Sequence, residues 1–193
     1  VMHAAVMASF GAFDSNDDDR VLWRLDRLGN ALYLLVQSRR RPDFTHIVEQ
    51  FGRPAAGQTW DTLEYDHFLD SIAEGSVWRF RLRANPTHSV MEEGSSRGKV
   101  CHHVTAEQQM MWLNGKAERC GFTIESDDPS IGADIVQREV RRFKRGGKTV
   151  TLSTVTFEGV LQVTDAELFR KSMAEGIGRA KAYGCGLLTV IRT

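Results

Sequence analysis

The sequence has few cysteines and no long apolar run. The three cysteines, Cys101, Cys120 and Cys185, are widely spaced along 193 residues, which favours free thiols over a disulfide framework. No apolar run approaches the roughly 20 residues that a membrane helix needs, and no charged, apolar and small-residue series marks a signal peptide. With 41% hydrophobic residues the chain can bury a core. We therefore expect a soluble globular protein in the cytoplasm, with no membrane partner.

An excess of charge of either sign is also missing. Lys and Arg total 25, and Asp and Glu total 25, so the formal net charge is zero. This overall balance neither favours nor excludes a polyanionic partner such as a nucleic acid. Only the distribution of the charges along the chain is informative.

The segment "GIGRAKAYGCGLL" at residues 176–188 looks like a phosphate-binding loop, but it contains none of the established phosphate-binding motifs. A P-loop needs glycine directly before its lysine and a hydroxyl residue directly after it, but Lys181 stands between Ala180 and Ala182. A dinucleotide-binding motif begun at Gly176 meets Lys181 where its last glycine belongs. Glycine-rich loops let the backbone approach a ligand closely, so the segment needs another explanation.

Metal-ligand spacing is missing as well. None of the six histidines has a histidine partner at the i, i+4 spacing of a helical zinc site, and Cys101, His102 and His103 lack a second cysteine at CxxC spacing. The carboxylates do not cluster in the way that a two-metal nuclease site needs. We therefore predict no bound metal and no cofactor.

The strand patterns predict a sheet with a basic face. Strand pairs are expected over 21–38 and again over 62–86. The second member of the later pair, "VWRFRLRANP", alternates apolar side chains with Arg79, Arg81 and Arg83. The arginine face is either solvated or in contact with RNA, and a solvated face is the more frequent of the two.

The second half of the chain has the order of a ferredoxin-like unit. Its elements are delimited by a capping box at Thr105 and Gln108, a helix-ending Gly121, a hairpin turn at Gly146 and Gly147, and a helix cap at Thr164. These signals predict strand, helix, strand, strand, helix, strand. The first half opens with a helical pattern and fits the same order only if a strand precedes Val1. We predict an α+β fold of two tandem ferredoxin-like (RRM-like) domains, over 1–88 without its first strand and over 89–193.

The predicted hairpin around Gly146 and Gly147 carries the densest charge. Six cations lie within eleven residues: Arg138, Arg141, Arg142, Lys144, Arg145 and Lys148. A charge run is usually a solvated face, and edge strands carry cations to prevent edge pairing. Six cations opposed only by Glu139 are more than edge protection needs, so we interpret the hairpin as a contact to a phosphate backbone.

Four stretches occur together in a known order. They are "MHAAVMASF" at the start, "VWRFRLRANP" in the middle, "TFEGVLQVTD" later and "GIGRAKAYGCGLLTV" at the end. With them the chain resembles the CasE-type CRISPR RNA-processing endoribonucleases, the subunit of the type I-E Cascade complex that cuts the repeat hairpin. The glycine-rich stretch and "FRLRANP" are the most specific, and the similarity covers essentially the whole chain.

The resemblance implies an activity, a set of partners and a fold. It implies metal-independent cleavage on the 3′ side of the repeat stem-loop of CRISPR precursor RNA, which leaves a 2′,3′-cyclic phosphate, with the product hairpin staying bound. The implied partners are the CRISPR repeat RNA hairpin and the other Cascade subunits, with target DNA contacted only through the complex. The implied fold is a tandem pair of ferredoxin-like domains.

The resemblance also implies roles for individual residues. The family's catalytic histidine on the first helix falls on His3, which by its spacing alone would more often be structural. His3 is expected to be the general base or acid, and Lys181 is expected to stabilise the charge on the phosphorane. Arg179 and the backbone amides around Gly178 are expected to hold neighbouring phosphates. A tyrosine that the family carries three positions before this histidine would precede Val1.

Two other interpretations stay open at this point. A non-catalytic RNA-binding subunit would use the same fold and charges to hold a guide RNA without cutting it. Replacing His3 separates that interpretation from an enzyme, because only cleavage depends on proton transfer. A metal-dependent nuclease would lose its cleavage activity in the presence of a chelator.

Overall fold

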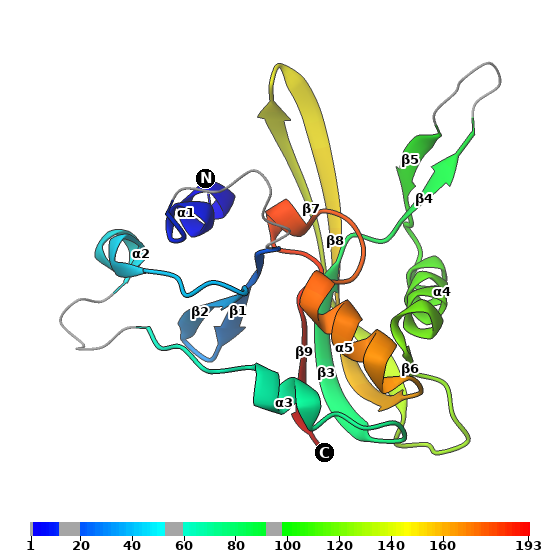
Figure 1. The fold of residues 1–193 in the computed structure, drawn as a ribbon. Helices are drawn as coiled ribbons and strands as arrows, with labels where there is room; N and C mark the ends of the chain where they lie inside the picture. Colours follow the sequence, from blue (N-terminus) through cyan, green and yellow to red (C-terminus); the bar gives the residue numbers. More distant parts are fainter. Residues whose placement is uncertain (1, 12–19, 53–59, 92–97) are drawn as a thin grey trace.

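The chain folds into a mixed α+β structure built on a five-stranded antiparallel sheet (Figure 1). The computed structural model describes residues 2–11, 20–52, 60–91 and 98–193. The sheet has the order β6-β8-β3-β9, and β7 also pairs with β8. Its strands are β3 (Val77–Ala84), β6 (Phe122–Thr123), β7 (Gly132–Arg145), β8 (Lys148–Val163) and β9 (Leu188–Arg192). All of their pairings are antiparallel, and β3 lies between β8 and β9.

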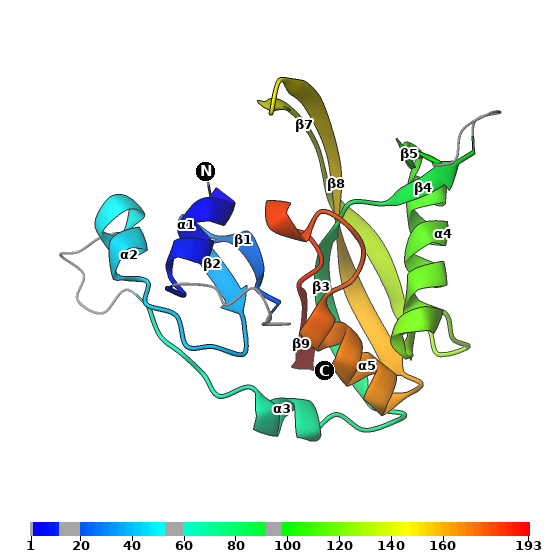
Figure 2. The ribbon, with the colours of Figure 1, turned by 45° about the horizontal axis from the view of Figure 1, so that its top comes forward.

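Two helices, α4 (Ala106–Ala117) and α5 (Ala166–Glu175), cover one face of this sheet (Figures 1 and 2). The core holds Leu113 and Ala117 of α4, Phe169 and Met173 of α5, and Trp78, Phe80 and Leu82 of β3. These β3 residues alternate with the three arginines because successive side chains of a strand point to opposite faces. The apolar face of β3 is therefore buried under the helices, and the arginine face lies on the other side.

The start of the second helix differs from the sequence-based prediction. The cap of α5 is Asp165 and not Thr164, because the Asp165 carboxylate accepts a hydrogen bond from the backbone amide of Leu168 (2.9 Å). The capping box of α4 is confirmed, with the Thr105 hydroxyl accepting from the Gln108 amide. The hairpin turn at residues 146 and 147 is also confirmed, since β7 ends at Arg145 and β8 begins at Lys148.

A smaller unit precedes the large sheet. Its strands β1 (Leu22–Leu28) and β2 (Ala31–Gln37) pair antiparallel, as predicted. Helices α1 (Met2–Ala8) and α2 (Thr45–Phe51) belong to the same part of the chain (Figure 2). The residues that form its own small core are Val6, Phe10, Val21 and Trp23. The first helix is thus fixed on β1 by apolar packing.

Arg24 joins the two sheets. The residue is 1% exposed, and its side chain donates hydrogen bonds to the carbonyls of Arg81 and Leu187 (2.9 Å each) and to the Thr189 hydroxyl (2.8 Å). Asp26 on the same strand accepts from Nε at 2.9 Å and from Nη2 at 2.7 Å. The buried charge is therefore paired, and its remaining donors are satisfied by β3, by β9 and by the residue just before β9.

The prediction of a strand as the first member of the pair over 62–86 is wrong. Residues Asp66–Asp70 form a helix, α3, instead of a strand. Tyr65, Phe68 and Leu69 recur at helical spacing and pack against the core of the large sheet. The ring of Phe68 lies 5.5 Å from that of Trp78, edge to face. Tertiary packing of one apolar side therefore determines this short helix.

β3 pairs across the boundary that was predicted at residue 88. It lies before this residue, and its two partners β8 and β9 lie after it. In chain order β3, α4, β6, β8, α5 and β9 are strand, helix, strand, strand, helix and strand. A hairpin that the sequence did not predict, β4 (Thr87–Val90) with β5 (Lys99–His102), is inserted between β3 and α4. The division of the chain into two domains stays a prediction.

Two further predictions concern the cysteines and membrane-spanning helices. All three cysteines are free, as predicted, and burial raises the pKa of the Cys185 thiol to about 12. Within the described residues no helix has both the length and the apolar character needed to cross a membrane.

Candidate functional site

The glycine-rich segment 176–188 forms a loop that is anchored at both ends. The amide of Gly186 donates to the carbonyl of Arg83 on β3 (2.8 Å), and the carbonyl of Gly186 accepts from the amide of Ile177 (2.8 Å). A short 3-10 turn, η3 (Lys181–Tyr183), lies between the anchors. Ala180, directly before η3, has a φ of 67°, which a residue with a side chain rarely adopts. The fold therefore constrains the backbone that carries Lys181.

Two glycines let this loop pack on two tryptophans. A Cβ atom at Gly178 would lie 3.0 Å from the ring of Trp112 on α4, and one at Gly184 would lie 2.8 Å from the ring of Trp23 on β1. Both positions also have positive φ, 82° and 77°, which favours glycine. The glycines therefore allow a close approach to protein side chains, and the loop connects the helix layer of the large sheet to the smaller unit.

Lys181 lies among other charges. Burial and then the neighbouring Arg20 guanidinium lower the pKa of its ammonium, and Lys116 on α4 acts in the same direction. Glu175 at the end of α5 acts in the opposite direction. A lysine whose charged form is disfavoured donates a proton or a hydrogen bond more strongly than a solvated lysine does. The position can therefore stabilise a developing negative charge.

His3 lies on α1, and α1 contacts η3. The helix is held from two sides: Val6 packs on Trp23, and the Nε2 of His46 on α2 donates to the carbonyl of Ala5 (3.0 Å). The side chain of His3 is half-buried. The structure thus brings together the helix of His3 and the turn of Lys181, although the two residues are 178 positions apart in the chain.

The basic hairpin β7–β8 meets the same loop. The ring of Phe143 on β7 lies 5.3 Å from the ring of Tyr183 in η3. The hairpin extends well beyond the helix-covered part of the sheet (Figure 1). One of its predicted RNA contacts is partly engaged, because Arg141 donates to Glu139 (2.5 Å). Glu139 also accepts from Arg83 on β3 (2.6 Å), so this face of the hairpin is tied to the sheet.

The opposite face of the hairpin carries three of the predicted cations, Arg138, Arg142 and Lys144. They lie four and two residues apart on β7, and because both spacings are even they share one face. All three side chains are exposed. Arg145 and Lys148 flank the turn, and their side chains lie outside the described part of the structure. Arg179, in the glycine-rich loop, is exposed as well.

The arginine face of β3 is largely engaged within the protein. Arg81 is half-buried and lies 3.2 Å from Glu158 and 3.6 Å from Asp26. Arg83 is held by Glu139 and also donates to the hydroxyl of Thr154 (3.2 Å). Of the three arginines only Arg79 is exposed. For Arg81 and Arg83 the structure therefore shows neither the solvated face nor the RNA contact considered from the sequence, because both are paired within the protein.

The histidines after β3 form a pair and not a metal centre. The rings of His88 and His103 lie 4.6 Å apart, and burial together with His88 lowers the pKa of His103. His102 instead lies 3.1 Å from the Asn85 side-chain oxygen through its Nδ1. Across the described ranges, no three or more His, Cys, Asp or Glu residues come together in a way that could hold a metal ion.

Sequence reasoning missed Arg20 and Lys116, the two further cations around Lys181. Arg20 stands alone in an acidic stretch, and nothing in its spacing points to the loop. Lys116 follows Trp112 by four positions on a helix that was correctly predicted, so its place beside the tryptophan could have been predicted, but its proximity to Lys181 could not. Its ammonium lies 5.9 Å from the centroid of the Trp112 ring.

The chain is similar to known proteins over nearly its whole length. A family model described as CRISPR associated protein matches residues 1–192. The CRISPR-associated endoribonuclease Cse3 of Thermus thermophilus is 30% identical, over 98% of this chain and 88% of that protein. The Cascade subunit CasE of Escherichia coli K12 is 28% identical, over 80% and 78%. A structure of Cse3 bound to a 19-nucleotide RNA has a TM-score of 0.78 at 27% identity, covering 98% of this chain and 88% of that one.

Proposed function

The chain belongs to the family of CRISPR-associated proteins as a member of the CasE type, and on this premise we propose that it is an endoribonuclease that cuts the repeat hairpin of CRISPR precursor RNA. The observation that carries the proposal is the contact of α1, which bears His3, with η3, which bears Lys181. A relative similar over nearly the whole chain is named an endoribonuclease, and its solved complex contains RNA.

The proposed chemistry is transesterification by the RNA itself. The 2′-hydroxyl oxygen attacks the adjacent phosphorus, the bond from phosphorus to the 5′-oxygen breaks, and the products are a 2′,3′-cyclic phosphate and a 5′-hydroxyl. His3 accepts the proton of the 2′-hydroxyl or donates a proton to the departing 5′-oxygen, since histidine does either near neutral pH. Lys181 donates to the phosphorane oxygens, where negative charge accumulates. These steps need no metal ion.

The exposed cations of β7 and the glycine-rich loop are proposed to bind the RNA stem. Arg138, Arg142 and Lys144 face away from the ion pair of Arg141 with Glu139, so they are available to phosphates. Arg179 and the amides around Gly178 extend this contact toward the reaction centre. The major groove of A-form RNA is too deep and narrow for side chains to read, so we expect contacts to phosphates and to the shape of the stem.

We further propose that the fold is a tandem pair of ferredoxin-like domains. The order of elements from β3 to β9 supports the second of these domains, with the β4–β5 hairpin and the strand β7 as additions. The pairing of β3 favours a boundary before Val77 over one at residue 88. In this proposal the protein is cytoplasmic, binds the other Cascade subunits, and reaches target DNA only through that complex.

The reaction class is tested by incubating the full chain with a labelled RNA hairpin that carries the repeat of its host's own array. We expect cleavage on the 3′ side of the stem in EDTA, and end-group analysis should find the cyclic phosphate. Loss of cleavage in EDTA that Mg²⁺ restores would instead establish a metal-dependent nuclease.

The role of His3 is tested separately from binding. We expect His3→Ala to bind the hairpin as tightly as the wild-type protein and to cleave it at least 100-fold more slowly, because general acid–base catalysis contributes about 10²–10⁴-fold. Single-turnover cleavage and filter binding on the same RNA measure the two effects. Equal cleavage by both proteins would remove His3 from the mechanism, whereas binding without cleavage by the wild-type protein would favour a non-catalytic RNA-binding subunit.

A further inference from the structure

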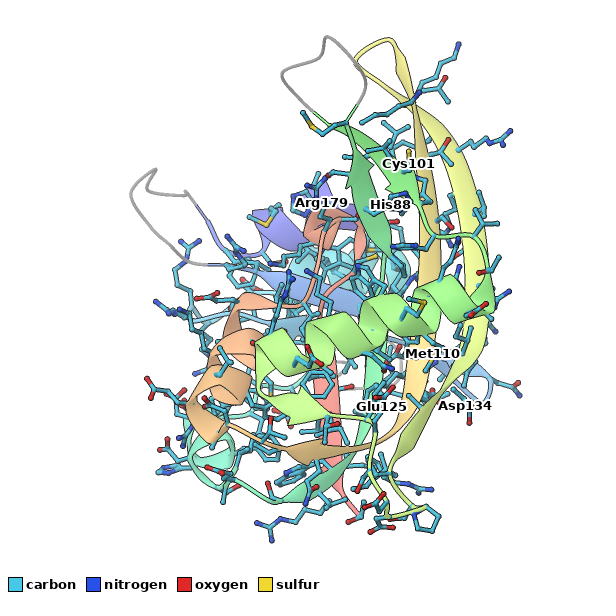
Figure 3. All side chains as sticks on the ribbon, turned by 90° about the vertical axis from the view of Figure 1, so that its right-hand side faces the viewer. His88, Cys101, Met110, Glu125, Asp134 and Arg179 are labelled. Atoms are coloured by element: carbon cyan, nitrogen blue, oxygen red, sulfur yellow. The ribbon has the colours of Figure 1, made fainter. Side chains whose placement is uncertain are left out.

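The second half of α4 lies against the glycine-rich loop through Trp112. The ring of Trp112 occupies the space that a side chain at Gly178 would need, and its other neighbour is Phe157 of β8, stacked at 6.3 Å. Lys116, one turn further along, places its ammonium 5.9 Å from the Trp112 ring centroid. Figure 3 views the molecule from this side, with α4 in front and Arg179 of the loop labelled. The tryptophan thus fixes the lysine beside the loop.

The charges around this contact are unbalanced. Lys116 and Arg20 both act on Lys181, whereas Glu175 is the one carboxylate among the groups that shift its pKa. Neither Lys116 nor Arg20 forms an ion pair with any of the described residues. Three cations therefore lie near one carboxylate, and repulsion by the other two adds to burial in disfavouring the charged form of Lys181. An arrangement of this kind attracts anions, and a bound phosphate relieves the repulsion.

We propose that Lys116 is a phosphate-binding residue of the site, which together with Lys181 holds the RNA backbone beside the glycine-rich loop. The ligand is a phosphodiester of the RNA, and the contact lies on the α4 side of the loop, away from the basic hairpin. This inference rests on the proposed function, because it assigns a further contact to the same RNA. It adds α4 to the elements that bind the RNA, beside the basic hairpin, the first helix and the glycine-rich loop.

A structural role is the competing explanation for Lys116. A lysine in the last turn of a helix interacts favourably with the helix dipole, and its aliphatic stem covers apolar surface. Two variants separate these roles. Lys116→Met keeps an apolar stem on Trp112 and removes the charge, whereas Lys116→Arg keeps the charge. Lys171→Met is the matched control, since Lys171 is an exposed lysine on α5 that is not among the groups acting on Lys181.

The experiment measures hairpin binding at several salt concentrations and single-turnover cleavage, using the repeat RNA hairpin and the full chain. We expect Lys116→Met to weaken binding several-fold and to lower the slope of log affinity against log salt by about one, the effect of one lost phosphate contact. Lys116→Arg should retain the wild-type slope, and so should Lys171→Met.

The outcomes separate this inference from the proposed function. If the wild-type protein cleaves the hairpin and Lys116→Met has the wild-type salt slope, the inference about Lys116 is wrong and the proposed function stands. This holds even if the variant melts at a lower temperature. A wild-type protein that does not cut the hairpin overturns the proposed function. If it still binds the hairpin, the salt slopes test the lysine contact independently. A slope that falls for Lys171→Met as much as for Lys116→Met also overturns the inference, because the effect is then not local.

Discussion

At the scale of single residues, Trp23 limits what can stand opposite it in the glycine-rich loop. A methyl group at Gly184 would meet the Trp23 ring at 2.8 Å while the backbone is in a positive-φ conformation. We therefore predict that Gly184→Ala lowers the free energy of unfolding by about 1–3 kcal/mol, from overpacking and backbone strain together. Urea unfolding followed by tryptophan fluorescence measures the change.

Gly115 provides the matched control for this prediction. It lies within α4, and a Cβ atom there would have no neighbour within 4 Å. Alanine is the better helix former, so Gly115→Ala should stabilise the protein by roughly 0.5–1 kcal/mol. If both alanine variants changed the stability equally, steric conflict with Trp23 would not be the reason for glycine at position 184.

At the scale of elements, the β7–β8 hairpin presents two different faces. One face is tied to the sheet through Glu139, and the other exposes Arg138, Arg142 and Lys144. We predict that replacing these three residues with alanine lowers the salt slope of hairpin binding by up to about three and leaves the cleavage position unchanged. Binding titrations over a range of salt concentrations measure the slope.

The control for the hairpin variant is Arg79→Ala. Arg79 is an exposed arginine on β3, outside the hairpin and the loop, and its loss should leave the slope as it is in the wild-type protein. A triple variant that binds with the wild-type slope would place the RNA elsewhere. In that case the cations of β7 would only protect an exposed hairpin from edge pairing.

Elements with local signals were predictable from the sequence. The capping box at Thr105 and the turn at Gly146 and Gly147 each depend on a few neighbouring residues, and both are present in the structure. The helix at Asp66–Asp70 was not predicted, because packing on Trp78 determines it and propensity does not. The partners of β3 lie more than 70 residues further along, and alternation alone cannot identify them.

At the scale of the whole molecule, the candidate site is assembled from distant parts of the chain. The resemblance of four short stretches was enough to name His3 and Lys181, and the density of positive charge was enough to name the basic hairpin. Their juxtaposition through α1, η3 and the ring of Phe143 required the fold. Lys116 was missed because its role depends on the loop that packs on Trp112, and that contact is a tertiary one.

The buried Arg24 has a consequence for the order in which the protein can be made. Its hydroxyl acceptor on Thr189 lies 165 residues further along, and its carbonyl acceptor on Leu187 lies 163 residues further along. A ribosome adds about 5–20 residues each second, so the guanidinium emerges roughly ten seconds or more before these acceptors exist. A nascent chain halted between the two stretches therefore cannot bury this charge as the finished protein does.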